Sequence, residues 1–398
     1  MTVAGLAHAD DNAALPTWSF RGFGSVGVAY SGNSDAEYTS SILKANGVGY
    51  TRHWSSALDS RLGAQLNLNL DQQWSAVVQV IAEQRLREAY TPSVEWANIK
   101  YQATPDLSLR VGRIALPMFV AADYRKIGYA YPWARTPVEV YGTLTLTSSD
   151  GVDATYRWNR NGVKNVTQVF FGGTVMHLPT TRVEARKVAG FSHSVEYGAL
   201  SARVSMLSTE LTVDMGSELF GAMRQFGPQG IALADRYEVD HKHATEMRIG
   251  ATYDPGQWFA MGELGSFRSR SFLGRSTSLY ASTGYRVGNF TPYLGYARVR
   301  AASPASEPGL DLAGVPPAAA PAAAQLNWYL GEVLSTIPIQ RTTSIGTRWD
   351  CATDVALKLQ FDRVKPLAGS HGTFMHVQPS FRSGRSISVA SAVLDFVF

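Results

Sequence analysis

The end of the chain alternates between apolar and polar positions, one residue at a time. Leu394, Phe396 and the terminal Phe398 fall on one face of an extended backbone, and Asp395 falls on the other. A period of two is the pattern of a β-strand whose two faces meet different surroundings. It predicts a strand over about residues 385–398 that ends at the carboxyl terminus.

The same alternation returns in earlier segments, such as residues 61–70 and 355–363. In the first of these, Leu66 lies between Gln65 and Asn67, and apolar and polar residues continue to alternate along the segment. The interior of a soluble β-sandwich is apolar, whereas the inner face of a membrane barrel is wet and polar. The polar faces of these segments therefore favour a membrane barrel over a soluble sandwich.

Seven short segments rich in turn-forming residues separate pairs of predicted strands. They lie at residues 71–73, 104–106, 159–162, 198–199, 254–257, 287–289 and 351–354. The turns join fourteen strands, and a first strand at about residues 18–31 and the final strand bring the count to sixteen. The sequence thus predicts an all-β fold, a transmembrane antiparallel β-barrel of about 16 strands. An even count places both ends of the chain on the same side of the membrane.

The bulk composition is compatible with a barrel and excludes a helical membrane protein. The mean hydropathy is −0.10 over 398 residues, and no apolar run approaches the roughly 18 residues that a membrane helix needs. A barrel exposes only every second residue to lipid, so its mean hydropathy stays near zero. Cys351 is the only cysteine, so no internal disulfide is expected. The net charge of +4 is modest and its basic residues are scattered, so nucleic acid is not an expected partner.

The first residues have the features of a cleaved export signal. Small residues at Ala7 and Ala9 form a cleavage motif that leaves Asp10 as the start of the mature chain. We expect residues 1–9 to be a signal-peptide remnant and residues 10–398 to form a single barrel domain. The alternative for the first segment is a disordered polar tail.

The remaining segments are predicted to be eight external loops, two of which are long. One covers about residues 208–243 and contains a possible short helix at residues 217–226. The other covers about residues 302–340. Its Pro/Ala-rich stretch, residues 316–324, is typical of a flexible or polyproline-like segment, and one or two helical turns are expected after it.

The third loop begins after a strand at residues 107–113 and continues to about residue 142. It is rich in Tyr, Trp and Pro. An exposed loop of that composition is costly in water, so we expect it to fold onto another part of the protein.

Several short motifs occur along the chain together with the predicted strands. They are Arg-Gly-Phe-Gly at residues 21–24, Val-Gly-Arg at residues 111–113, the aromatic segment 129–141, Gly-Thr-Arg-Trp-Asp at residues 346–350 with the strand 357–363, and the terminal Phe398. In these motifs the chain resembles the Gram-negative porin superfamily. The resemblance implies a homotrimeric outer-membrane barrel, a third loop folded into the lumen, and a closing strand that the barrel-assembly machinery reads at Phe396 and Phe398. The third loop lacks the acidic Pro-Glu-Phe-Gly-Gly signature of the enterobacterial general porins, so their cation preference is not carried over.

A porin conducts by passive diffusion, and its selectivity follows from the width of the pore and from fixed charge. Candidate groups of the constriction are Asp123, Arg125, Lys126, Tyr129, Tyr131, Trp133, Arg135 and Glu139. Candidate charges of the pore wall are Arg61, Glu83, Lys100, Arg110, Arg248, Arg348 and Lys358. The basic excess predicts a mild preference for small anionic solutes. The three aromatic groups either offer a surface for sliding solutes or anchor the loop against the wall.

Other readings of the sequence are weaker. Residues 22–27 match G-x-G-x-x-G but lie inside a predicted strand, so close approach of a neighbouring chain or a trimer contact explains them better than a dinucleotide site. No metal, cofactor or enzymatic activity is expected, because no catalytic motif or convincing ligand set is present. The main alternative function is an adhesin or receptor that acts through the long external loops. Expected partners are outer-membrane lipid, lipopolysaccharide and small solutes, with both termini in the periplasm.

Overall fold

The computed structural model describes residues 16–41, 44–85, 89–142, 146–177, 181–302 and 307–398. The predicted signal remnant, residues 1–9, lies outside them. No helix in these ranges is long and apolar enough to cross a membrane.

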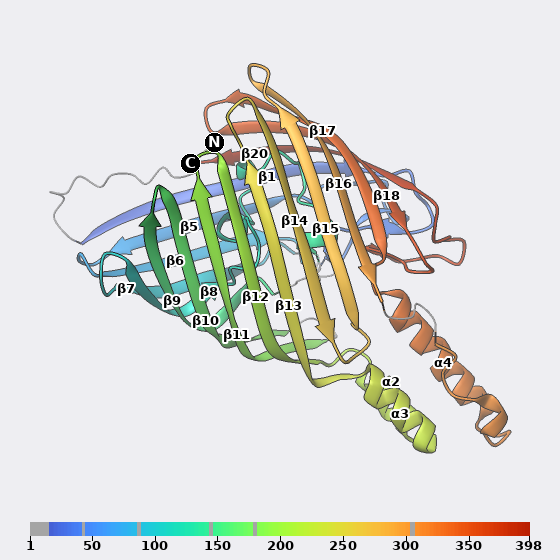
Figure 1. Cartoon of the computed structure of the whole chain (residues 1–398). Helices are drawn as coiled ribbons and strands as arrows, with labels where there is room; N and C mark the ends of the chain where they lie inside the picture. The colour runs from blue at the N-terminus through green and yellow to red at the C-terminus, as the bar shows by residue number, and fades with distance from the viewer. Residues whose placement is uncertain (1–15, 42–43, 86–88, 143–145, 178–180, 303–306) are drawn as a thin grey trace.

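Sixteen antiparallel strands close into one barrel (Figure 1). They are β1 (Thr17–Tyr30), β5 (Arg61–Asn69), β6 (Trp74–Glu83), β7 (Pro92–Gln102), β8 (Leu107–Ala115), β9 (Ser148–Arg160), β10 (Val163–His177), β11 (Arg182–Tyr197), β12 (Leu200–Val213), β13 (Val239–Tyr253), β14 (Trp258–Ser269), β15 (Arg275–Tyr285), β16 (Phe290–Ala301), β17 (Gln340–Ala352), β18 (Val355–Pro366) and β20 (Ile387–Val397). The first strand pairs with β5 on one side and with β20 on the other, which leaves no open edge. The predicted fold class and strand count are confirmed.

All seven predicted tight turns connect neighbouring strands at one end of the barrel. The β9–β10 turn shows why the sequence marks them so clearly. Asn161 and Gly162 both have positive φ, at 53° and 78°, as a two-residue type I′ turn requires. Asparagine and glycine tolerate that conformation at low cost.

The two faces of the barrel wall differ in the predicted way. On β18, Leu359 is 50% exposed on the outer face, whereas the neighbouring Lys358 is fully covered on the inner face. Aromatic side chains collect at the turn end of the outer face, where Trp74 lies 4.7 Å from Tyr101 and Phe290 stacks on Trp349. Such rings favour the headgroup level of a membrane because one part is apolar and another can meet water.

The seam between the first and last strands depends on two glycines of β1. A Cβ at Gly22 would lie 2.1 Å from the ring of Phe398, and a Cβ at Gly24 would lie 2.4 Å from the ring of Phe396. The backbone of Phe398 also exchanges two hydrogen bonds with Gly22, at 2.8 and 2.9 Å. The glycine-rich motif of β1 therefore makes room for the terminal aromatic rings.

The longer connections lie at the opposite end. The first loop, L1 (residues 31–60), contains β2 (Glu37–Tyr38), β3 (Val48–Gly49) and β4 (Trp54–Ser55). The last loop, L8 (residues 367–386), contains β19 (Phe374–Met375), which completes a small sheet with β2 and β3.

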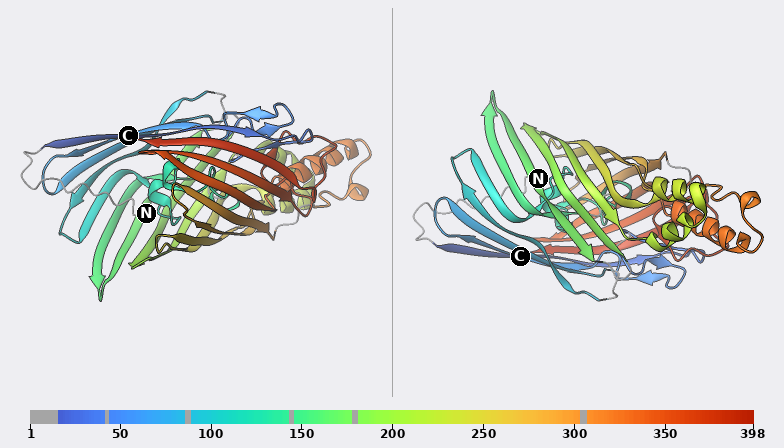
Figure 2. Two further views of the ribbon diagram at one scale, coloured as in Figure 1. Left: turned by 90° about the horizontal axis from the view of Figure 1, so that it is seen from above. Right: turned by 90° about the horizontal axis from the view of Figure 1, so that it is seen from below.

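Two further loops form helices that project from this end (Figures 1 and 2). Loop L5 (residues 214–238) holds α2 (Ser217–Arg224) and α3 (Gly227–Tyr237), and loop L7 (residues 302–339) holds η3 (Leu312–Gly314) and α4 (Ala320–Ser335). L5 is shorter than predicted because β12 and β13 continue to pair up to Val213 and Val239.

The prediction of a flexible or polyproline-like stretch at residues 316–324 is wrong for its second half, which begins α4. Pro321 stands in the first turn of that helix, where its missing N–H is not needed. The alanines around it are the strongest helix formers. The helix continues to Ser335, so it is also longer than the one or two turns predicted.

Candidate functional site: the third loop and the inner wall

The third loop, L3 (residues 116–147), lies inside the ring of strands (Figure 2). It contains the short elements η1 (Ala122–Tyr124), η2 (Gly128–Ala130) and α1 (Val138–Tyr141). Its backbone and side chains meet the inner faces of distant strands. The Ser205 hydroxyl of β12 donates to Met118 O at 2.8 Å, and Gln360 of β18 accepts from Ala134 N at 3.0 Å. Apolar side chains such as Phe119 bury the loop further.

The aromatic residues of L3 act as anchors where they are fully buried. Tyr131 and Trp133 are only 5% and 4% exposed, and their rings stack at 5.7 Å. The Trp133 Nε1–H donates to Ser282 Oγ at 2.9 Å, and its ring meets Tyr280 edge-on at 5.4 Å. Of the two alternatives for these rings, the buried geometry supports anchoring over a sliding surface. Tyr129 is half-buried and lies under the Arg348 guanidinium at 4.6 Å.

Arg135 is buried and joins L3 to L1 and to the barrel wall. Its guanidinium forms a bidentate ion pair with Asp59 at 2.8 and 2.6 Å, and a further ion pair with Asp362 at 3.3 Å. It also donates to Ser391 Oγ at 3.0 Å and lies 5.3 Å from the ring of Tyr38. A guanidinium has five donors in a planar fork, which suits it to hold several oxygens at once.

A second buried pair fastens L3 to the seam of the barrel. Lys358 Nζ lies 2.7 Å from Asp395 and donates to Gly128 O at 2.6 Å. The Ser25 hydroxyl donates to the same aspartate at 2.5 Å. Gly128 is needed at this point, because a Cβ there would lie 2.2 Å from Asp395 Oδ1.

Three predicted wall residues thus lie on the inner face but are covered by L3. Besides Lys358, Arg348 donates to Tyr129 O at 2.5 Å, and Arg248 donates to Val140 O at 3.1 Å. Glu139 is likewise buried and accepts from Gln340 at 2.7 Å and from Thr342. Asp123 belongs to η1, but its side chain lies outside what the structure describes.

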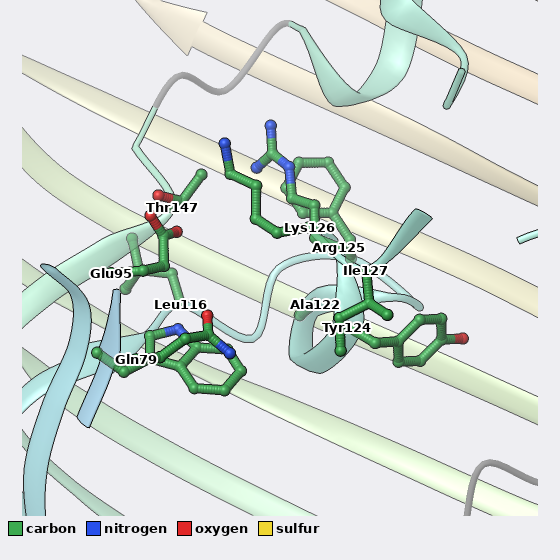
Figure 3. A pocket seen from close by; sticks show the side chains of 11 residues that line it. Gln79, Glu95, Leu116, Ala122, Tyr124, Arg125, Lys126, Ile127 and Thr147 are labelled. Carbon is green, nitrogen blue, oxygen red and sulfur yellow. The ribbon is translucent and has the colours of Figure 1, made fainter. Parts of the chain in front are cut away.

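Arg125 and Lys126 occupy the part of L3 that faces β6 and β7. Figure 3 shows both side chains around a small pocket that Gln79 and Glu95 also line. The Arg125 guanidinium lies 4.6 Å above the ring of Phe119. Lys126 Nζ pairs with Glu83 at 2.5 Å.

A larger polar cavity of about 100 Å³ lies between L1, L3 and the external ends of β5 and β6. Arg61 and Glu83, both predicted wall residues, line it together with Lys126. Lys44 of L1 also reaches this cavity. Burial lowers the pKa of the Lys44 ammonium to about 8, and the neighbouring Arg61 and Lys126 act in the same direction against the opposing effect of Glu83.

Two further predicted residues stand on the inner wall away from this cavity. Lys100, Arg110 and Asp153 are directly opposite one another on β7, β8 and β9. Arg110 pairs with Asp153 at 2.9 Å. This row adds positive charge to the inner face. Its residues form no hydrogen bond or ion pair with the described part of L3.

Sequence reasoning missed several acidic partners and one lysine. Asp362 and Asp395 stand at polar positions of their strands, so the alternation was a usable signal for their inward direction. Asp59 and Lys44 belong to L1, where no periodicity predicts the direction of a side chain.

A closed barrel with an apolar outer face, a polar inner face and a loop across its lumen defines an outer-membrane channel. The comparisons with known proteins agree. Residues 1–330 match the family model described as Gram-negative porin. The chain therefore belongs to the Gram-negative porin family, and its place is the outer membrane of a Gram-negative bacterium.

Solved structures share the fold at low sequence identity. The outer-membrane channel DcaP of Acinetobacter baumannii matches with a TM-score of 0.56 and 10% identity over 96% of this chain and 97% of that one. OmpF of Salmonella typhi matches with a TM-score of 0.55 and 11% identity over 96% and 98%. A trimer form of OmpT, an outer-membrane protein of Vibrio cholerae, matches with a TM-score of 0.52 and 10% identity over 97% and 100%. No curated protein matches the chain in sequence.

Proposed function

We propose that this channel lets small hydrophilic solutes diffuse passively and that it favours anions. The observation that carries the anion preference is the state of the carboxylates around L3. Asp59, Asp362 and Asp395 are each held in buried ion pairs with Arg135 or Lys358. Lys44 and Arg61 form no ion pair with a carboxylate in the described part of the chain. The fixed charge that borders the cavity between L1 and L3 is therefore positive on balance, and low-dielectric walls strengthen its effect.

We assign two roles to the predicted site residues. Arg61, Glu83, Lys100, Arg110 and Lys126 are the charged groups that a solute meets. The covered residues keep L3 in place and set the width of the pore; they are Tyr131, Trp133, Arg135, Glu139, Arg248, Arg348 and Lys358. Arg125 and Tyr129 are partly buried, and we assign both roles to them. The proposal contains no catalytic step.

We further propose an orientation and an assembly. The end with the seven tight turns faces the periplasm and carries both termini, since periplasmic turns are short in such barrels. The barrel functions as a homotrimer in contact with lipid and lipopolysaccharide. The exposed Phe398 and the adjacent Phe396 form the signal that the barrel-assembly machinery reads, after removal of a signal peptide.

Conductance in a planar bilayer under a salt gradient tests the proposal. We expect stepwise openings in threes, with a reversal potential that indicates anion preference. Openings with cation preference would keep the channel and reject the charge assignment. Correctly folded protein without openings would reject the channel itself.

One observation favours a second role as an adhesin or receptor. L5 and L7 do not extend separately, because the side chain of Gln229 bonds to the backbone of Gly309 and Asp311 and Phe220 is fully buried in their shared core. The resulting lobe exposes Trp328 by 60% and Tyr329 by 45%. Replacement of both loops by short turns separates the two functions, because conductance should persist while binding to cells or matrix should be lost.

A further inference from the structure

The cavity between L1 and L3 has an unbalanced set of charges. Its described lining includes the basic residues Lys44, Arg61, Arg85, Arg125, Lys126 and Arg135, and the acidic residues Asp59 and Glu83. The excess of cations lies on three separate parts of the chain, namely L1, the external ends of β5 and β6, and L3. L1 leads directly into β5 at Arg61, whereas L3 follows β8 and meets them only in the folded arrangement.

Both acidic residues of the cavity are already engaged. Asp59 holds the Arg135 guanidinium at 2.8 and 2.6 Å. Glu83 lies 2.5 Å from Lys126 and 3.7 Å from Arg85. Glu83 and Asp59 act on Lys44 at longer range, and Glu83 also acts on Arg61, but neither carboxylate forms an ion pair with Lys44 or Arg61 in the described part of the chain.

Lys44 is the central group of the site. It is 7% exposed, and within the described residues its ammonium donates one hydrogen bond, to Ala57 O at 3.1 Å. An ammonium has three donors, and a buried cation is costly without a compensating charge. Arg61 lies on the same cavity wall and forms no hydrogen bond or ion pair within the described ranges. The Ser40, Ser41 and Thr136 hydroxyls add neutral polar groups to the lining.

We propose that this cavity is a saturable binding site for a single oxyanion group, the carboxylate or phosphate of a solute on its way through the channel. The inference rests on the proposed function and adds a binding step to it. A volume of about 100 Å³ has room for such a group. Lys44 and Arg61 would supply charge-assisted hydrogen bonds, which are about twice as strong as neutral ones.

The test measures block of the chloride current through single channels of the full-length protein by inorganic phosphate and, separately, by acetate. We expect the current to fall to a plateau at millimolar concentrations of at least one of them. A block by phosphate alone assigns the site to phosphate groups, and a block by acetate alone assigns it to carboxylates.

Lys44→Met and Arg61→Gln should each raise the half-blocking concentration about tenfold, the effect expected for loss of one charge-assisted hydrogen bond. Lys187→Met is the matched control, because Lys187 is a lysine on the outer face that pairs with Glu210 at 3.0 Å. It should leave the block unchanged. Lys44→Arg keeps the charge and should retain the block, and heat-modifiable migration on gels verifies that each variant is folded.

Two results would overturn the inference while leaving the channel in place. One is a wild-type current that neither anion blocks, and the other is an equal loss of block in Lys187→Met, which would point to general charge screening. A folded wild-type protein without any current would instead overturn the proposed function.

Discussion

At the scale of single residues, charge on the inner face has two different uses. Arg135 and Lys358 are buried with their carboxylates and hold L3 against the wall. Lys44 and Arg61 border a polar cavity instead. Removal of a charge should therefore change stability in the first case and ion selectivity in the second.

Arg135→Met should destabilise the protein by about 3–5 kcal/mol, because it leaves Asp59 and Asp362 buried without their counter-charge. Urea unfolding in lipid vesicles measures the loss, and single-channel recordings should show an unsteady current as L3 loosens. Arg113→Gln is the control, since the pair of Arg113 with Asp150 is largely exposed and should contribute little. Equal effects of the two variants would contradict the anchoring role of Arg135.

Anion selectivity should fall as the pH rises from 7 to 9, because the pKa of Lys44 is lowered to about 8 and the ammonium loses its proton in that range. Reversal potentials at several pH values measure the change. Lys44→Met should have lower selectivity at pH 7 and no such transition.

The same shift has an effect of known sign on stability. The folded state releases the proton at lower pH than the unfolded state, whose reference pKa is 10.5. Between about pH 8 and 10.5 the unfolded state binds more protons, so this group makes folding more favourable as the pH rises through that range. In the selectivity experiment, a decrease of anion selectivity between pH 7 and 9 that persists in Lys44→Met would mean that another group titrates in that range.

At the scale of elements, L3 depends on close backbone contacts as well as on charge. Its pieces are too short to be stable alone, since isolated helices of fewer than about 12 residues are marginal in water. The loop keeps its path because strands on several sides of the lumen provide partners for its backbone. At Gly128 the loop also lies so close to Asp395 and Ser25 that there is no room for a Cβ.

Gly128→Val should displace the tip of L3, because a Cβ would lie 2.2 Å from Asp395 Oδ1 and 2.6 Å from Ser25 Oγ. We expect an altered single-channel conductance from a barrel that still forms. Gly221→Ala in α2 is the matched control, because the space around that glycine is open. An unchanged conductance in Gly128→Val would mean that the tip of L3 does not limit the pore.

At the scale of the whole molecule, the barrel turns the usual arrangement of a protein inside out. Apolar side chains such as Leu359 and Ile345 are on the outside, and ion pairs such as Lys358–Asp395 are buried on the inside. The depth of a position in the membrane should then decide how much an outward-facing charge lowers the free energy of unfolding.

Leu359→Arg should destabilise the barrel by about 2–4 kcal/mol, the cost of an arginine facing lipid near the bilayer midplane. Leu200→Arg, at the turn end of β12, should cost only about 0–1 kcal/mol near the interface. Urea titrations in vesicles compare the two. Equal costs would contradict the depth that the barrel assigns to these positions.

The sequence by itself determined the strand count, the seven tight turns and the inner or outer direction of residues such as Leu394 and Asp395. These features depend on local periodicity and on turn chemistry, which neighbouring residues specify. The length of the L7 helix α4 was underestimated from the sequence, because the alanine-rich segment gains its fixed position only by packing against L5.

Only the tertiary structure decided which inward charges are covered and which border a cavity. Alternation places Lys358 and Arg61 on the same face but does not reveal what lies in front of each. L3 covers Lys358 because residues more than two hundred positions away, around Gly128, cross the lumen to meet it. Contacts between segments so distant in sequence leave no periodic pattern, since they arise only when the barrel has closed around the loop.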